Sequence, residues 1–368
     1  MSDSGRFIRN VLIKALLLFL AISGIFSLIH PMAALGRLSI YNGLVPGRVR
    51  LPYGEHPQSD YNLSLFNLDA MFASHEISAQ PVPGEFRVVL IGDSSTWGYL
   101  LPPDQTMAAV INRRGVDNIR VYNIGYPTMS VTKDLLMMQS ALRYHPDLII
   151  WLVTLESLPQ DTQLNSPILQ HNADAVRTLI TRYGLRSNGS DPRLITPTFW
   201  DRTINGERRA LADLVRLQLY GFLWAATGVD QSFPAHYDPP QKDLDPDASF
   251  DGRLPPSLSP DDLALDVLNA GREMAGNVPV WIVNEPIYVS TGRNSDIRYN
   301  FFYPRWAYDQ YRGLLEGWCR AHAVNYLDAW DVIPAEDFSN SAIHRTPLGE
   351  TLLADWLEAA IVKDGNVR

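Results

Sequence analysis

The chain has 368 residues, of which 46% are hydrophobic and 10% aromatic, so it can bury a large core as one or two domains. Its net charge of −9 comes from scattered acidic residues, and no stripe of lysine and arginine could neutralise phosphates, which argues against a nucleic-acid partner. The single cysteine, Cys319, excludes an intramolecular disulfide and a cysteine-based metal site. No two histidines lie one helical turn apart, so we expect neither a metal nor a cofactor.

An apolar segment near the amino terminus, residues 11–29, predicts a helix that crosses a membrane once. At about 1.5 Å per residue its length approaches the ~30 Å thickness of the hydrocarbon layer. Arg6, Arg9 and Lys14 favour a cytoplasmic amino terminus, although arginines also follow the segment. A cleaved signal peptide is the alternative, but the sequence HPMAALG lacks the small residues of a cleavage site. We therefore expect an uncleaved anchor within residues 1–35 and an extracytoplasmic remainder.

After the anchor, the lead-in of residues 36–85 shows no helical or strand periodicity in its Pro-, Gly- and Tyr-rich part, residues 41–62. It predicts a stalk or an extended segment laid over the following domain.

From residue 86 onward, predicted strands alternate with predicted helices, which indicates βαβ units and a parallel sheet. The strands are expected at 87–92, 119–125, 147–154, 278–284 and 324–329, and the helices at 107–114, 132–144, 259–274, 303–322 and 346–362. One α/β domain, 86–368, then encloses an insertion at about 159–260. Within the insertion, helices near 172–183 and 207–228 precede an irregular loop, and we expect the longer helix to cover the core or the site rather than contact a membrane.

Two segments carry candidate catalytic residues. The stretch VVLIGDSSTWG takes a buried strand directly into Asp93 and Ser94, at the sheet edge where ligands of α/β proteins bind. Ser94 can act there as a nucleophile if a base lies nearby, whereas the alternative is that this turn only caps a helix. His344 lies in a short connection before the last helix, a suitable place for a general base, with a plain surface histidine as the alternative.

The segments IGDSSTWG, VYNIGYPTMS and SAIHRTPLGETLLADWL resemble the first, second and last blocks of the SGNH (GDSL-type) hydrolase superfamily. The resemblance implies a three-layer α/β/α sandwich with a mostly parallel sheet, of the flavodoxin-like kind. It also implies a nucleophile at Ser94, a base at His344 and an oxyanion site formed by the N–H groups of Ser94 and Gly125, with Asp93 counted in the catalytic set. A membrane-anchored member further resembles enzymes that add or remove acyl groups on cell-surface polysaccharides.

The sequence departs from the family pattern at two places. The third block normally supplies an oxyanion donor from an asparagine, but here it reads WLVTLESL, where Thr154 could donate instead. The triad aspartate normally stands three residues before the histidine, but that position is a serine preceded by Asn340. The group that orients His344 could therefore be Asn340, Asp337 or Glu156.

These departures leave two hypotheses. The first is a serine esterase or O-acyltransferase that acts, through an acyl-serine, on an ester such as an acetyl group of an extracytoplasmic glycan or a lipid-linked substrate. The second is a catalytically reduced relative that binds glycan or scaffolds a membrane acyl-transfer complex, in which a protein partner would be expected. A dinucleotide-binding enzyme is disfavoured because GDSSTWG lacks the second glycine that lets backbone approach a pyrophosphate.

Overall fold

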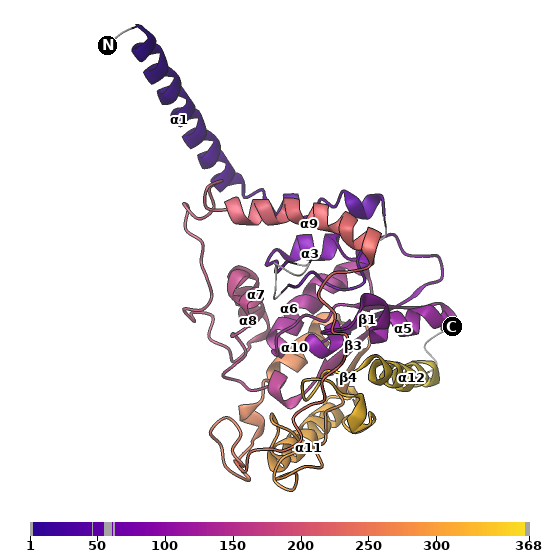
Figure 1. The fold of residues 1–368 in the computed structure, drawn as a ribbon. Helices are drawn as coiled ribbons and strands as arrows, with labels where there is room; N and C mark the ends of the chain where they lie inside the picture. Colours follow the sequence, from indigo (N-terminus) through magenta and orange to yellow (C-terminus); the bar gives the residue numbers. More distant parts are fainter. Residues whose placement is uncertain (1–2, 46, 55–60, 62, 365–368) are drawn as a thin grey trace.

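A parallel five-stranded sheet forms the centre of the protein in the computed structural model, which describes residues 3–45, 47–54, 61 and 63–364 (Figure 1). The strand order is β2-β1-β3-β4-β5, and all four neighbouring pairs are parallel. The strands are β1 Phe86–Ile91, β2 Ile119–Asn123, β3 Leu148–Val153, β4 Val280–Asn284 and β5 Asn325–Asp328. The predictions for residues 1–2, 46, 55–60, 62 and 365–368 lie outside the described residues.

Helices cover both faces of the sheet, so the predicted three-layer α/β/α fold with a parallel sheet is confirmed. Val88 and Leu90 of β1 face a core built with α5 and α12, whereas Val89 and Ile91 face a core built with α6, α10 and α11. This alternation follows from the two-residue repeat of a strand, and burial of both faces explains why the strands are almost continuously apolar. These helices are α5 Met107–Arg114, α6 Val131–Ala141, α10 Leu265–Ala275, α11 Arg305–Ala321 and α12 Pro347–Asp364.

Capping residues set where several of these helices begin and end. The Thr106 side chain accepts the N–H of Ala109 at the start of α5, and Gly115, at φ +63°, ends the helix. The predicted helix at 259–274 begins later than expected, at Leu265, because the segment before it forms a short 3₁₀ turn at Pro260–Asp262. Boundaries of this kind depend on local capping more than on apolar periodicity.

The insertion contributes α7 Pro167–His171, α8 Ala173–Tyr183 and α9 Arg208–Thr227, and the segment after α9 is largely irregular, as expected. One side of α9 packs on the domain, where Leu217, Gly221 and Trp224 are buried. Gly221 is required at this contact because a Cβ there would lie 2.2 Å from the Tyr41 ring. The other side of α9 faces away from the domain, and the helix begins beside the base of α1 (Figure 1).

The amino-terminal helix α1, Asp3–Ile29, projects from the domain (Figure 1). It is longer than the predicted 11–29 because the polar residues before the apolar segment are also helical. Its most apolar 18-residue window has a mean hydropathy of 2.5, and α1 is the one helix among the described residues that is long and apolar enough to cross a membrane. Almost all of its side chains are exposed, with burial confined mainly to Ser23 and Ser27 near its end.

The described part of the lead-in packs on the domain. It contains the short helices α2 Met32–Gly36 and α3 Leu68–Ala73. The side chains of Tyr41, Leu51 and Met71 are fully buried in the same core as α6 and α10. This segment therefore contributes to the folded structure of the α/β domain.

Candidate active site

The turn after β1 places Ser94 at the carboxyl edge of the sheet. Asp93 caps the single-turn helix α4, Ser94–Trp97, by accepting the N–H of Ser95 through its carboxylate at 2.8 Å. Gly98, at φ +84°, ends the helix in the left-handed region that favours glycine. Ser94 is the first residue of α4 and remains partly exposed, whereas Asp93 is buried. The structure therefore gives the Asp93 carboxylate a capping contact and leaves the Ser94 hydroxyl facing outward.

The structure brings Ser94, His344 and Asn340 together in one line of side chains. Nε2 of His344 lies 2.9 Å from Oγ of Ser94, although 250 residues separate them in the sequence. On the other side of the ring, Nδ1 lies 3.3 Å from Oδ1 of Asn340. Of the three predicted orienting groups, Asn340 is the one that lies within hydrogen-bond distance of the His344 ring in the described part of the chain.

This arrangement selects one tautomer of the imidazole. With its amide oxygen toward the ring, Asn340 accepts a hydrogen bond from Nδ1–H. Nε2 then carries no proton and can accept the hydrogen of the Ser94 hydroxyl, which is the geometry of a general base and its nucleophile.

The surroundings of His344 favour its neutral form. Burial, with a smaller contribution from the neighbouring Arg345 charge, lowers the pKa of His344 to about 3. The ring of Tyr99 covers it at a centroid distance of 4.9 Å. Asn340 supplies a neutral oxygen rather than a carboxylate, so it does little to raise this pKa. These surroundings therefore keep His344 neutral at neutral pH and disfavour its protonated form.

The other two candidate orienting groups have different surroundings. Asp337 is buried, and its Oδ1 accepts a hydrogen bond from the Thr346 hydroxyl at 3.4 Å. Burial, followed by the charges of Asp251 and Asp161, raises the pKa of Glu156 to about 7. Within the described part of the chain, neither carboxylate hydrogen-bonds His344.

Both predicted oxyanion donors besides Ser94 are engaged elsewhere in this structure. The N–H of Gly125 donates to Oδ1 of Asn123 at 3.0 Å, and the Thr154 hydroxyl donates to the Tyr303 hydroxyl at 2.9 Å. Gly125 nevertheless packs tightly against α4: a Cβ at this position would lie 2.5 Å from the backbone nitrogen of Trp97. The N–H of Ser94, in the first turn of α4, is the donor next to the nucleophile.

A buried carboxyl that the sequence reasoning missed lies under the nucleophile turn. Glu285 directly follows β4, and its Oε2 accepts the hydroxyl of Ser95, while Arg345 lies 3.8 Å away. Burial and the nearby negative charge of Asp93 raise the pKa of Glu285 well above its ordinary value. The sequence contained a signal for Glu285, because it is an acidic residue at the carboxyl end of a predicted strand.

Arg345, the residue after His344, ties the histidine loop to the nucleophile turn. Its guanidinium is fully buried and donates to the Ser95 carbonyl at 3.0 Å and to the Glu350 carboxylate at 2.7 Å. The same Glu350 accepts the N–H of Met107 at the start of α5. These buried contacts join the His344 loop to the turn that carries Ser94, and so fix the relative positions of the two residues.

Helix α4 is also held from its other side by a buried ion cluster. Arg50, in the lead-in, forms a two-point contact with Asp230 at 2.7 and 2.6 Å, and Arg48 contacts the same carboxylate at 2.7 Å. Arg50 stacks on the Trp97 ring, 4.0 Å from its centroid, and donates to the Gly98 carbonyl at 2.7 Å. Asp230 comes shortly after α9, so the cluster joins the insertion, the lead-in and α4.

We expect Asp230→Ala to destabilise the protein by about 3–5 kcal/mol, because it leaves two buried guanidinium groups without their carboxylate. The exposed ion pair of Glu316 and Arg320 on α11 provides the control, and Glu316→Ala should cost less than about 1 kcal/mol. The free energies of unfolding from denaturant titration compare the two variants. Equal effects would show that the buried cluster adds no special stability.

The irregular segment after α9 reaches the catalytic residues. The carbonyl of Asp238 accepts the N–H of Asn340 at 2.6 Å, and the Tyr237 hydroxyl contacts the Leu100 carbonyl at 3.5 Å. Asn340 has φ +33°, a left-handed conformation that asparagine adopts more readily than most residues. The insertion therefore helps to hold the orienting side chain.

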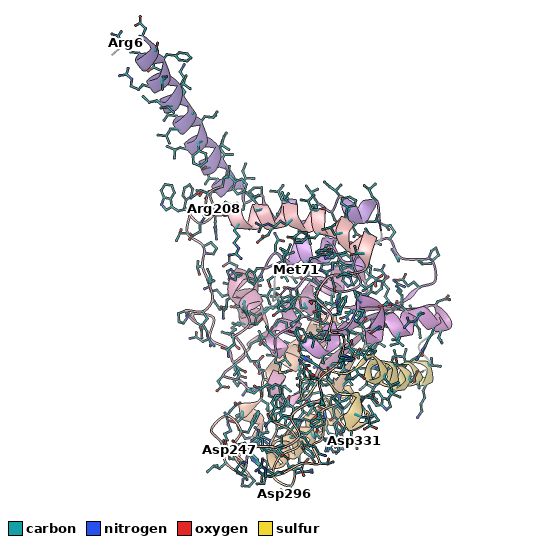
Figure 2. The ribbon with its side chains drawn as sticks, viewed as in Figure 1. Arg6, Met71, Arg208, Asp247, Asp296 and Asp331 are labelled. Carbon is teal, nitrogen blue, oxygen red and sulfur yellow. The ribbon has the colours of Figure 1, made fainter. Side chains whose placement is uncertain are left out.

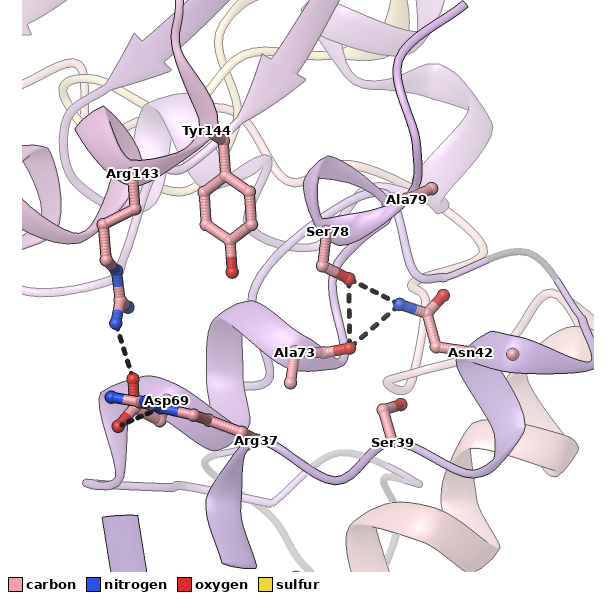
Figure 3. Close-up of a pocket in the computed structure, with 10 residues that line it drawn as sticks. Arg37, Ser39, Asn42, Asp69, Ala73, Ser78, Ala79, Arg143 and Tyr144 are labelled. Atoms are coloured by element: carbon pink, nitrogen blue, oxygen red, sulfur yellow. Dashed lines mark hydrogen bonds and ion pairs between the residues drawn. The ribbon is translucent and has the colours of Figure 1, made fainter. Parts of the chain in front are cut away.

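A polar pocket of about 540 Å³ lies away from these residues, between the lead-in and the end of α6 (Figure 3). Asp69 pairs there with Arg143 at 2.7 Å and with Arg37 at 3.4 Å. Asn42 donates to the Ser78 hydroxyl at 2.6 Å. None of the predicted site residues lines this pocket. Its paired charges fasten the segment after α1 to the domain.

No family model matches the sequence, and no curated protein matches it. Several solved structures are similar. They include a protein of the G-D-S-L lipolytic family from Desulfitobacterium hafniense, at 12% identity over 75% of this chain and 99% of that chain, with a TM-score of 0.34. A carbohydrate acetylesterase from Sinorhizobium meliloti is 13% identical over 76% of this chain and 99% of its own, with a TM-score of 0.37. An aryl esterase of M. smegmatis is 14% identical over 75% of this chain and 98% of its own, with a TM-score of 0.37.

At these identities the likeness concerns the fold alone. The motifs that carry the resemblance in the sequence lie at the carboxyl edge of the sheet, and the serine of the first motif contacts the histidine of the last. In its parallel sheet, in the order of its motifs and in this contact, the chain resembles the SGNH (GDSL-type) hydrolases.

Proposed function

We propose that the protein is a serine esterase or O-acyltransferase that works through an acyl-serine at Ser94. The observation that carries this proposal is the 2.9 Å contact between Oγ of Ser94 and Nε2 of His344, with Nδ1 held by Asn340. A partly exposed serine, a neutral base and a group that fixes the tautomer are the parts that nucleophilic acyl transfer requires.

The proposed reaction proceeds in two steps. Oγ of Ser94 attacks the ester carbonyl while its proton moves to Nε2 of His344, and the N–H of Ser94 faces the developing oxyanion. Collapse of the tetrahedral intermediate releases the alcohol, which takes the proton from Nε2. Water, or the hydroxyl of an acceptor, then attacks the acyl-serine with His344 again as the base, and Ser94 is regenerated.

The neutral Asn340 makes this site slower than one with a carboxylate. The imidazolium formed in each step lies in a buried position beside Arg345 and receives only an amide oxygen at Nδ1. An asparagine in the triad position of a serine protease has cost about 10⁴ in rate. The same observation favours the second candidate function, a reduced relative that binds an acylated glycan or scaffolds a membrane acyl-transfer complex.

The proposed location of the reaction is a membrane surface. The exposed apolar helix α1 supports anchoring by a single span, and positive residues at its start favour a cytoplasmic amino terminus. The domain would then act outside the cytoplasm on an ester of a surface glycan or of a lipid-linked substrate. Protease added to intact spheroplasts should degrade the domain; full protection until lysis would contradict this orientation.

Covalent labelling tests the proposed chemistry. A fluorophosphonate should modify Ser94 and leave Ser95 unmodified, because the Ser95 hydroxyl is buried and donates to Glu285. Mass spectrometry of the tryptic peptides distinguishes the two adjacent serines. Absence of any adduct at Ser94, in a protein that still binds glycan, would favour the reduced relative over the enzyme.

A further inference from the structure

The helix α9 has apolar side chains on two faces, and only one of them is covered. Its buried face packs on the domain as described above. On the opposite face, large apolar side chains are exposed at three- and four-residue intervals, namely Val215, Leu219, Phe222 and Leu223. Helical spacing places these four residues on one continuous surface.

Exposed apolar residues of one other segment, in the lead-in, lie beside this surface. The N–H of Ile40 donates to the Gln218 side chain of α9 at 2.7 Å, and Gln218 donates to the Leu38 carbonyl at 3.2 Å. Both Leu38 and Ile40 are more than three-fifths exposed, and so is the neighbouring Leu44. We call this set of residues (Leu38, Ile40, Leu44, Val215, Leu219, Phe222 and Leu223) the α9 surface.

The α9 surface lies next to the end of the candidate membrane helix. The Ser27 hydroxyl, two residues before the end of α1, donates to the Phe199 carbonyl at 2.8 Å. Phe199 and Trp200 are largely exposed there, and tryptophan is the residue most typical of the membrane–water interface. Figures 1 and 2 show that α9 begins beside the base of α1, near Arg208, and runs from there over the domain.

The charges of α9 suit a lipid headgroup region. Arg208, Arg209 and Arg216 are exposed, and Asp213 is the one acidic residue between the ends of the helix. Arginine side chains can extend from an interfacial helix toward headgroup phosphates while neighbouring apolar side chains enter the acyl boundary.

From these observations we propose, in contrast to the expectation from the sequence that this helix does not contact a membrane, that the α9 surface, with Phe199 and Trp200, docks on the lipid bilayer that α1 enters. Continuity with α1 selects the bilayer as the occupant, because the contact of Ser27 with Phe199 and the contacts of Leu38 and Ile40 with Gln218 hold this surface beside the end of α1. Because α9 begins beside the base of α1, a bilayer that contains α1 would have its headgroups at the level of α9. This docking rests on the proposed anchoring by α1 and is independent of the proposed esterase activity.

Site-directed spin labelling of the full chain in vesicles of phosphatidylglycerol and phosphatidylethanolamine tests the docking. Cys319 is the chain's only cysteine and is buried, so a nitroxide should react selectively at an introduced cysteine. The labelled variants are Leu219→Cys on the α9 surface, Leu17→Cys on α1, and the control Asp296→Cys, which lies at the end of the molecule opposite α1 (Figure 2). Collision with oxygen reports lipid contact, and collision with a water-soluble nickel chelate reports water contact.

We expect labels at 17 and 219 to gain oxygen collisions and lose nickel collisions in vesicles, whereas the label at 296 stays accessible to nickel. Lipid contact at 17 with full nickel access at 219 would overturn the docking and leave the anchoring intact. Nickel access at both 17 and 219 would overturn the docking of the α9 surface and also the anchoring by α1. A label at 219 that is shielded from both reagents would show a protein partner or a second copy on this surface, which also overturns the proposal.

Discussion

Ser94→Ala should reduce ester hydrolysis to the background rate. Removal of the nucleophile from a serine triad has cost about 10⁶ in kcat, and no other hydroxyl contacts His344 Nε2 among the described residues. If the wild type is slow, the measurable decrease in rate is smaller than this. The rate of the variant is therefore compared with the rate at which the same ester hydrolyses without protein. A chromogenic acetyl ester and the full chain are sufficient for the measurement.

The fold of this variant should stay intact, because Ser94 is partly exposed and the change opens little core volume. An unchanged thermal unfolding midpoint is the control that separates lost chemistry from lost structure. Retention of most of the wild-type rate by a folded Ser94→Ala protein would remove Ser94 from the mechanism and leave the geometry of the site without a catalytic role.

Asn340→Asp should raise the rate of ester hydrolysis, by up to about 10⁴ if the full effect of a triad carboxylate is recovered. A carboxylate beside Nδ1 stabilises the imidazolium that forms when His344 takes the proton of Ser94. Aspartate also tolerates the left-handed backbone of this position, so the loop should keep its conformation.

The pH profile gives a second readout for the same substitution. In the wild type, His344 has a pKa of about 3, so its neutral, active form persists as the pH falls from 7 and is lost only near that value. The added carboxylate should raise this pKa, and the acidic limb of kcat/KM should move to higher pH. Asp337→Asn and Glu156→Gln are the matched controls, and neither should move the limb, because neither side chain hydrogen-bonds the ring.

No change in rate or in the acidic limb for Asn340→Asp would show that Asn340 does not orient the base. A shift for Glu156→Gln or Asp337→Asn instead would assign the orienting role to that carboxylate in the working enzyme. Because all three substitutions preserve side-chain size, they separate charge from packing.

The sheet could be predicted from sequence because each strand is buried on both faces and is bounded by polar turns. Segments such as β3, Leu148–Val153, read as continuous apolar runs of strand length, which leaves little ambiguity about their structure. The same pattern singled out Ser94 and His344, because each was expected in a turn before a predicted helix, and the structure places their side chains 2.9 Å apart.

Two other features could not be predicted, for physical reasons. His344 contacts Asn340 rather than Asp337 or Glu156, and Asn340 has a left-handed backbone whose N–H donates to a carbonyl 102 residues away in the insertion. The cluster of Arg50 and Asp230 joins residues 180 positions apart, and nothing local to either residue indicates the pair. In α9, apolar periodicity identified the helix but not which of its two apolar faces the domain covers.

The packed lead-in sets how far the site can reach. A flexible linker between a membrane helix and a domain would allow the site to sample a range of heights that grows with the square root of linker length. Here Tyr41 is buried against α9 and Arg50 against α4, so the segment that leaves α1 at Ile29 has joined the folded body by Tyr41. With α1 in a bilayer, Ser94 would therefore stand at one fixed height above the lipid, and the esters it can attack would be selected by their distance from the membrane as well as by their chemistry.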